Sequence, residues 1–100
     1  MIHQLLVDMT MDFIQSIASK AVVTMDGIEH QYDFYRVERD GNVLKKYVYL
    51  STEIGTITNA RVVDVQGRNL ESYTSHIEKG PDGFMIVFYL ALKVEGTVET

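Results

Sequence analysis

The amino-acid sequence contains no cysteine and only one proline among its 100 residues. Without cysteine, the chain can have no disulfide scaffold, no thiolate metal site and no cysteine nucleophile. It also lacks the run of about 18–20 apolar residues that a membrane-spanning helix requires. No P-loop, G-x-G-x-x-G or G-x-S-x-G motif is present. These absences predict a protein that binds no cofactor and does not act at a membrane.

Positive charge is also scarce, because nine basic residues face fourteen acidic ones and leave a formal charge of -5. Nucleic-acid affinity depends largely on Lys and Arg that neutralise phosphates. The densest basic pair is Lys45-Lys46, which is too small a patch to predict nucleic-acid binding. The first residues carry no basic region, and Asp8 and Asp12 interrupt their apolar content, so we expect no signal peptide and a cytoplasmic location.

What the chain does have is apolar content, at 46% hydrophobic residues and 23% charged ones. This composition and length predict one globular domain over residues 1–100. Residues 2–20 have the periodicity of a helix, with one apolar arc formed by Ile2, Leu5, Leu6, Met9, Phe13 and Ile17. A neighbouring arc, formed by Val7, Met11, Ile14 and Ala18, is apolar too. An N-cap at Asp8 or Thr10 would instead leave residues 2–7 as a short strand.

After Lys20 the pattern changes to short β-runs separated by turn residues. The predicted strands span residues 21–25, 28–38, 43–50, 56–66, 70–79 and 84–94, followed by a frayed tail at 95–100. Gly67-Arg68-Asn69 predicts a hairpin between the fourth and fifth strands. The fold class is therefore α+β, with one N-terminal helix and a five- to six-stranded, mostly antiparallel sheet or small β-sandwich.

Asp40-Gly41 predicts a further hairpin with a type I′ turn. With this dipeptide at the tip, Phe34 faces Tyr47, Tyr32 faces Tyr49, and Arg36 faces Lys45. The four aromatic side chains then form a strip on one face of the hairpin. They are either filling for the core or a recognition surface.

The last predicted strand contains nine consecutive apolar residues, 84–92. Such a run is typical of a strand that is covered on both faces. The turn at residues 80–83 predicts that this strand pairs with the preceding one, residues 70–79. Because the preceding strand is largely polar, we expect it at or near an edge and the last strand more centrally.

Three histidines, His3, His30 and His76, are not at the spacing of metal ligands. Asp64 and Glu71 approach each other across a predicted hairpin, with His76 farther along, but such groupings are common on ordinary surfaces. We therefore predict neither a metal site nor an enzyme.

The helix and the last strand together present more apolar surface than so short a chain can cover, which favours a homo-oligomer or docking to a larger structural protein. The alternative is a compact monomer with the helix wrapped by a curled sheet. The candidate interface residues are Val7, Met11, Ile14, Ala18, Tyr32, Phe34, Tyr47, Tyr49, Met85, Val87 and Tyr89.

A short N-terminal helix followed by Thr-, Val- and Tyr-rich β-runs with Asp-Gly turns resembles the small structural proteins of tailed bacteriophage particles. The segments IEHQYDFYRVERDGNVLKKYVYL and ARVVDVQGRNLESYTSHIEKGPDGFMIVFYLAL carry this resemblance. It implies a non-enzymatic virion component that acts through protein–protein contacts. The alternative interpretation is a small acidic module that binds or inhibits a host protein, with its acidic side chains gathered on one side.

Overall fold

The computed structural model describes residues 1–98, which form one helix and seven strands. The α+β class is confirmed, although there is one strand more than the five to six predicted. The elements are α1 (Gln4–Ile17), β1 (Lys20–Met25), β2 (Ile28–Tyr32), β3 (Arg36–Asp40), β4 (Val43–Leu50), β5 (Gly55–Val63), β6 (Asn69–Lys79) and β7 (Phe84–Ala91). The additional strand arises because the predicted run 28–38 divides into β2 and β3, which belong to different sheets.

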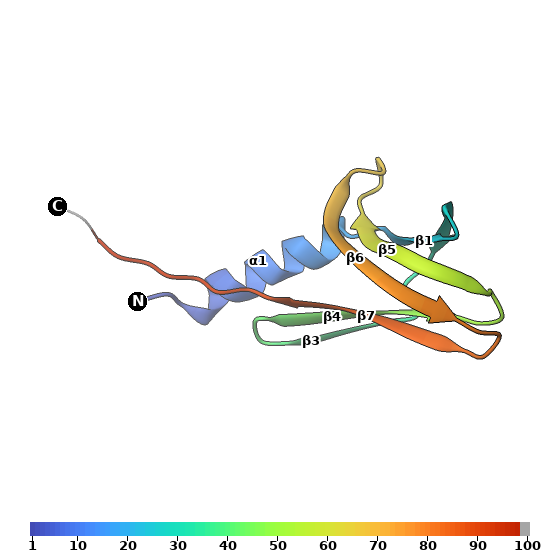
Figure 1. Cartoon of the computed structure of the whole chain (residues 1–100). Helices are drawn as coiled ribbons and strands as arrows, with labels where there is room; N and C mark the ends of the chain where they lie inside the picture. The colour runs from blue at the N-terminus through green and yellow to red at the C-terminus, as the bar shows by residue number, and fades with distance from the viewer. Residues whose placement is uncertain (99–100) are drawn as a thin grey trace.

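The strands form two antiparallel sheets that pack face to face (Figure 1). One has the order β2-β1-β5-β6 and the other the order β3-β4-β7. The main apolar cluster lies between them and includes Val23 and Ile57 from the first sheet and Val48 and Phe88 from the second. The three-stranded sheet projects beyond the four-stranded one, and α1 lies along this projecting part (Figure 1).

Helix α1 begins at Gln4, so neither Asp8 nor Thr10 is its N-cap. Its local signals are weak, since His3 makes no side-chain capping bond and the first turn carries no acidic residue. Tertiary packing must therefore supply its stability, and Met11 is completely buried. No helix among residues 1–98 is long and apolar enough to span a bilayer.

The turn between β1 and β2 is formed by an Asp-Gly dipeptide, which favours a type I′ turn between two strands. Asp26 and Gly27 have φ of 51° and 77°, which matches a type I′ turn. The Asp26 carboxylate also accepts a 2.9 Å hydrogen bond from the amide of Thr56. The predicted hairpin between β5 and β6 is likewise confirmed.

The predicted register of the β3–β4 hairpin is wrong by two residues, because Arg36 faces Tyr47 and Asp40 faces Val43. Only Gly41 of the Gly41-Asn42 loop has a positive φ, of 58°. A glycine in the first loop position is typical of a type II′ turn rather than the predicted type I′ turn. The aromatic strip predicted on this hairpin therefore does not form. Its first half lies before β3, where the chain crosses between the sheets.

The predictions for β7 are also wrong in three respects. It pairs with β4 rather than with β6, and it is an edge strand rather than a central one. Its burial alternates, so that its outward side chains are exposed. The reason is that the turn at residues 80–83 carries the chain from one sheet to the other instead of closing a hairpin. The edge position predicted for β6 is confirmed.

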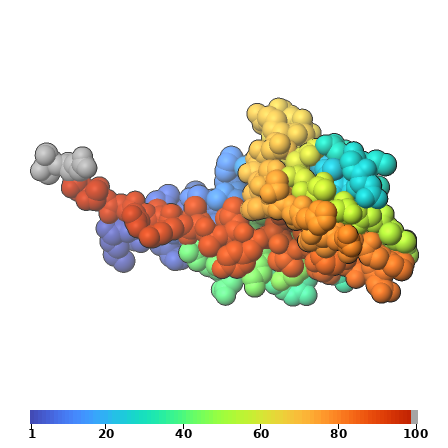
Figure 2. All heavy atoms as spheres, in the orientation of Figure 1, coloured from blue at the N-terminus to red at the C-terminus, as the bar shows by residue number. Residues whose placement is uncertain are grey.

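The molecule is elongated, with extents of 57 × 23 × 23 Å and a radius of gyration of 16.1 Å. A compact domain of 100 residues has a radius of gyration of about 13 Å. The start of α1 and the segment after β7 project together from one end of the sandwich (Figure 2). Helix α1 alone closes the projecting part of the three-stranded sheet, and this arrangement gives the molecule its length.

Candidate interaction surface

The outward face of the three-stranded sheet is built from alternate residues of β4 and β7. Tyr49 faces Met85 and Tyr47 faces Val87, while Tyr89 lies opposite Lys45. Because side chains alternate across a strand, all of these point away from the core. We call the surface formed by Tyr47, Tyr49, Met85, Val87 and Tyr89 the outer sheet face.

The outer sheet face is apolar and open to solvent. The exposed fractions of its side chains are 47% for Tyr49, 40% for Met85, 46% for Val87 and 57% for Tyr89. The outward face of the four-stranded sheet is different in kind, because it carries polar side chains such as those of Glu29 and Asn59. Of the two outward sheet faces, the outer sheet face is therefore the one suited to desolvation in a contact with another protein.

Two cations lie over aromatic rings at this surface. The Arg36 guanidinium carbon is 5.4 Å from the ring centre of Tyr47, and the Lys45 ammonium is 5.9 Å from that of Tyr89. Glu38 forms an ion pair with Arg36 and accepts a 2.9 Å hydrogen bond from the Tyr47 hydroxyl. The outer sheet face therefore combines exposed apolar groups with cations that lie over two of its aromatic rings.

The structure thus brings together five of the eleven predicted interface residues. Tyr32 and Phe34 lie apart from them and pack against the core cluster. The four helical residues, Val7, Met11, Ile14 and Ala18, are buried or half-buried, which places them on the side of α1 that faces its own chain.

The helical surface that remains exposed belongs to the other arc. Its exposed residues are Leu5 (68%), Leu6 (51%), Met9 (62%) and Phe13 (63%). The sequence shows two apolar arcs but contains no signal for which of them packs against the sheet, since that depends on where Leu44 and the other buried residues of the second sheet lie. The exposed arc is a functional candidate that the sequence pattern did not single out.

Compared with known family models, curated protein sequences and solved structures, the chain has no significant match. Its function is therefore argued from its own residues.

Two lysines are buried and fully engaged. The Lys46 ammonium lies 3.0 Å from a Glu71 carboxylate oxygen, and this ion pair links β4 to β6 across the two sheets. The Lys79 ammonium donates to four backbone carbonyl groups, those of Ser51, Glu53, Gly80 and Asp82. The second lysine therefore ties the two chain crossings at one end of the sandwich together. Both amines thus have partners within the fold.

The perturbed titratable groups also have structural partners. Burial and a hydrogen bond to Glu53 raise the pKa of Tyr32 to about 12. A hydrogen bond to Glu71, the larger cause, and burial, the next, together raise the pKa of Tyr73 to about 12. The backbone amide of Arg68 is the main cause that lowers the pKa of Asp64.

Asp64 and Glu71 do not form the acid–base pair considered from the sequence. The Asp64 carboxylate is bound within its own turn by the Arg68 side chain and amide, whereas Glu71 pairs with Lys46. Within residues 1–98, no group of three or more His, Asp or Glu side chains is arranged to hold a metal ion.

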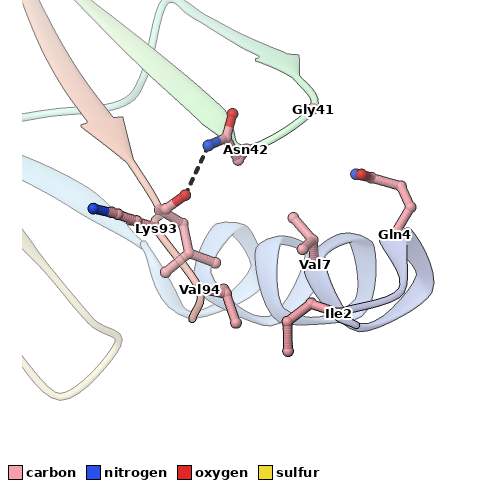
Figure 3. A pocket seen from close by; sticks show the side chains of 8 residues that line it. Ile2, Gln4, Val7, Gly41, Asn42, Lys93 and Val94 are labelled. Carbon is pink, nitrogen blue, oxygen red and sulfur yellow. Dashed lines mark hydrogen bonds between the residues drawn. The ribbon is translucent and has the colours of Figure 1, made fainter. Parts of the chain in front are cut away.

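The space between the start of α1 and the segment after β7 forms an open pocket of about 350 Å³ (Figure 3). Ile2, Val7 and Val94 supply its apolar wall, and the Asn42 amide donates a 2.8 Å hydrogen bond to the carbonyl of Leu92. Lys93 is the one charged residue in its lining. The Asn42 amide is bonded to the Leu92 carbonyl and the Lys93 amine points away from Ile2 and Val7 (Figure 3), so the outer sheet face is the stronger functional candidate.

Proposed function

We propose that this protein is a non-enzymatic assembly subunit that associates with copies of itself through the outer sheet face. The observation that carries this proposal is the contrast between the two sheets, because one outward face is polar and the other presents contiguous exposed apolar side chains. Burying a side chain such as Val, Leu or Met is worth about 1.5–3 kcal/mol. Covering Met85, Val87 and the tyrosine rings would therefore favour association strongly.

A role in a phage-like particle is part of this proposal and rests on the resemblance alone. The inhibitory module has less support, because acidic side chains are paired with basic ones on different elements. Asp12 pairs with Arg39 near α1, and Glu29 pairs with Arg61 on the four-stranded sheet. These pairs lie on different elements and neutralise charges that an acidic binding surface would need.

Sedimentation velocity over a range of concentrations tests the proposal. We expect the unmodified protein to associate, and we expect Met85→Glu to raise the dissociation constant at least about tenfold, which corresponds to about 1.4 kcal/mol. Gln31→Glu, a charge change at an exposed position of the four-stranded sheet, is the matched control and should leave the dissociation constant unchanged. A protein that stays monomeric up to millimolar concentration would refute the proposal.

A further inference from the structure

The sandwich is open along one side, where β6 and β7 lie beside each other as the edge strands of their two sheets (Figure 1). The Tyr73 ring on β6 is 6.0 Å from the Phe88 ring on β7, but β6 pairs only with β5 and β7 only with β4. An edge strand presents unpaired backbone N–H and C=O groups that can accept a further strand. At 11 residues, β6 is the longest strand of the described chain.

An apolar groove of about 150 Å³ runs along this open side. On β6 it is lined by Tyr73, Ser75 and Ile77. The alternate β6 residues, which include His76 and Glu78, lie on the opposite, polar face. A strand that pairs with β6 would therefore need apolar side chains on one face and polar ones on the other.

The segment after β7, residues 92–98, has this pattern. It reads Leu-Lys-Val-Glu-Gly-Thr-Val, with apolar residues at alternate positions except for Gly96. Such alternation predicts a half-buried strand, yet the segment forms none in this structure. Val98 is 90% exposed. The segment leads away from one end of the body (Figure 2), so it leaves the open side of its own chain uncovered.

We infer that residues 92–98 of a second copy add to β6 as an antiparallel strand, with Val94 opposite Ile77 and Val98 opposite Tyr73. In this register the apolar side chains enter the groove. On the polar face, Lys93 lies opposite Glu78 and Glu95 lies opposite His76. Lys93 thus meets a carboxylate and Glu95 meets an imidazole that can donate a hydrogen bond, and such polar cross-strand pairs are stabilising. Backbone hydrogen bonds provide affinity and the register provides specificity.

This mode of association is head-to-tail, because the segment of one copy occupies the open side of the next. It deepens the proposed function in that it also requires self-association, but it uses a different surface. In the single chain Val94 lines an open pocket with Ile2 and Val7, so docking moves this side chain from one apolar lining to another.

Disulfide trapping tests the inference, since the chain has no cysteine of its own. Single-cysteine variants at residue 94 or 98 are mixed with variants at residue 73 or 77, one of each pair carrying a size tag. A disulfide requires Cα atoms within about 7 Å, and residues 73 and 77 are about 13 Å apart along a strand. We expect Val94→Cys to cross-link with Ile77→Cys, and Val98→Cys with Tyr73→Cys. The two mismatched mixtures should cross-link at least about tenfold less.

Equal yields in matched and mismatched mixtures, or no cross-linking in any, would overturn the inference. A mixture of Val98→Cys with Gln31→Cys on the opposite edge strand, β2, provides the background yield. The Met85→Glu measurement separates the two proposals, because Met85 belongs to the outer sheet face alone, whereas Val87 also lines the groove. If Met85→Glu reduces association and no matched pair cross-links, the outer sheet face stands and the inference fails. Cross-linked matched pairs with unchanged association of Met85→Glu would mean the reverse.

Discussion

Two of the three buried polar or charged residues of the described chain are lysines. Lys46 has 1% of its surface exposed and Lys79 has 5%. A buried charge is tolerated only when it is paired or hydrogen-bonded. Glu71 provides this for Lys46, and four carbonyl oxygens provide it for Lys79. Both lysines join elements that are distant in sequence, so their role is to hold the two sheets in place.

Removing one member of the buried pair should therefore be costly. We expect Glu71→Leu to reduce the free energy of unfolding by about 3–5 kcal/mol, because it leaves the Lys46 ammonium buried without a counter-charge. The double variant Lys46→Met/Glu71→Leu should recover most of that loss. Urea unfolding followed by circular dichroism measures both. The exposed pair of Asp12 and Arg39 is the control, and Asp12→Leu should cost no more than about 1 kcal/mol.

Asp64 gives the fold a predictable pH dependence. Its pKa is lowered in the folded chain, so its carboxylate stabilises the fold at pH values above the unfolded pKa of about 3.9. This contribution is lost as the pH falls through the folded pKa. We expect Asp64→Asn to be less stable than the unmodified protein at pH 7, with a difference that shrinks steadily below pH 4. Thermal melts across this range measure it. A difference that is constant with pH would contradict the assignment.

At the scale of the elements, α1 shows how weakly an apolar pattern specifies orientation. Both arcs are apolar, but Met11 on one is fully buried and Met9 on the other is 62% exposed. The packing partner, which lies about thirty residues or more along the chain, decides between them. Periodicity predicts that a helix forms and does not predict which side packs.

These two methionines form a matched pair of test positions. We expect Met11→Ala to destabilise the chain by about 2–5 kcal/mol, because it leaves a cavity beside fully packed neighbours. Met9→Ala should change stability by no more than about 0.5 kcal/mol. Chemical denaturation of the two variants makes the comparison. A loss for Met9→Ala as large as that for Met11→Ala would contradict packing through the Met11 side alone.

The strands show where sequence reasoning succeeds and where it fails. Turns between adjacent strands are local, so Asp26-Gly27 and the loop before β6 could be recognised from a few residues. The pairing of β7 with β4 could not be recognised from the sequence. More than thirty residues separate the two strands, and the turn at 80–83 resembles a hairpin turn. Because the sequence predicts that β7 pairs with β6, the outer sheet face could not be predicted as one surface. Its residues are candidate interface residues individually, but only the β4–β7 register places Tyr47 beside Val87.

At the scale of the whole molecule, the chain has an apolar sheet face, an exposed helical arc and an open side, all on a body much longer than it is wide. A compact monomer with a wrapped helix, the alternative considered from the sequence, would show a rounder shape and fewer exposed apolar side chains. The uncovered faces arise because each sheet is covered on one face only, whereas the elongation arises because α1, part of the three-stranded sheet and the segment after β7 project from one end (Figure 1).

The start of α1 and the segment after β7 leave the body at the same end (Figure 1). The opposite end consists of the two loops that Lys79 clamps together. Immobilising the protein on a solid support through either terminus would therefore orient every molecule alike, with the clamped loops pointing outward and the long sides left accessible to a binding partner in solution.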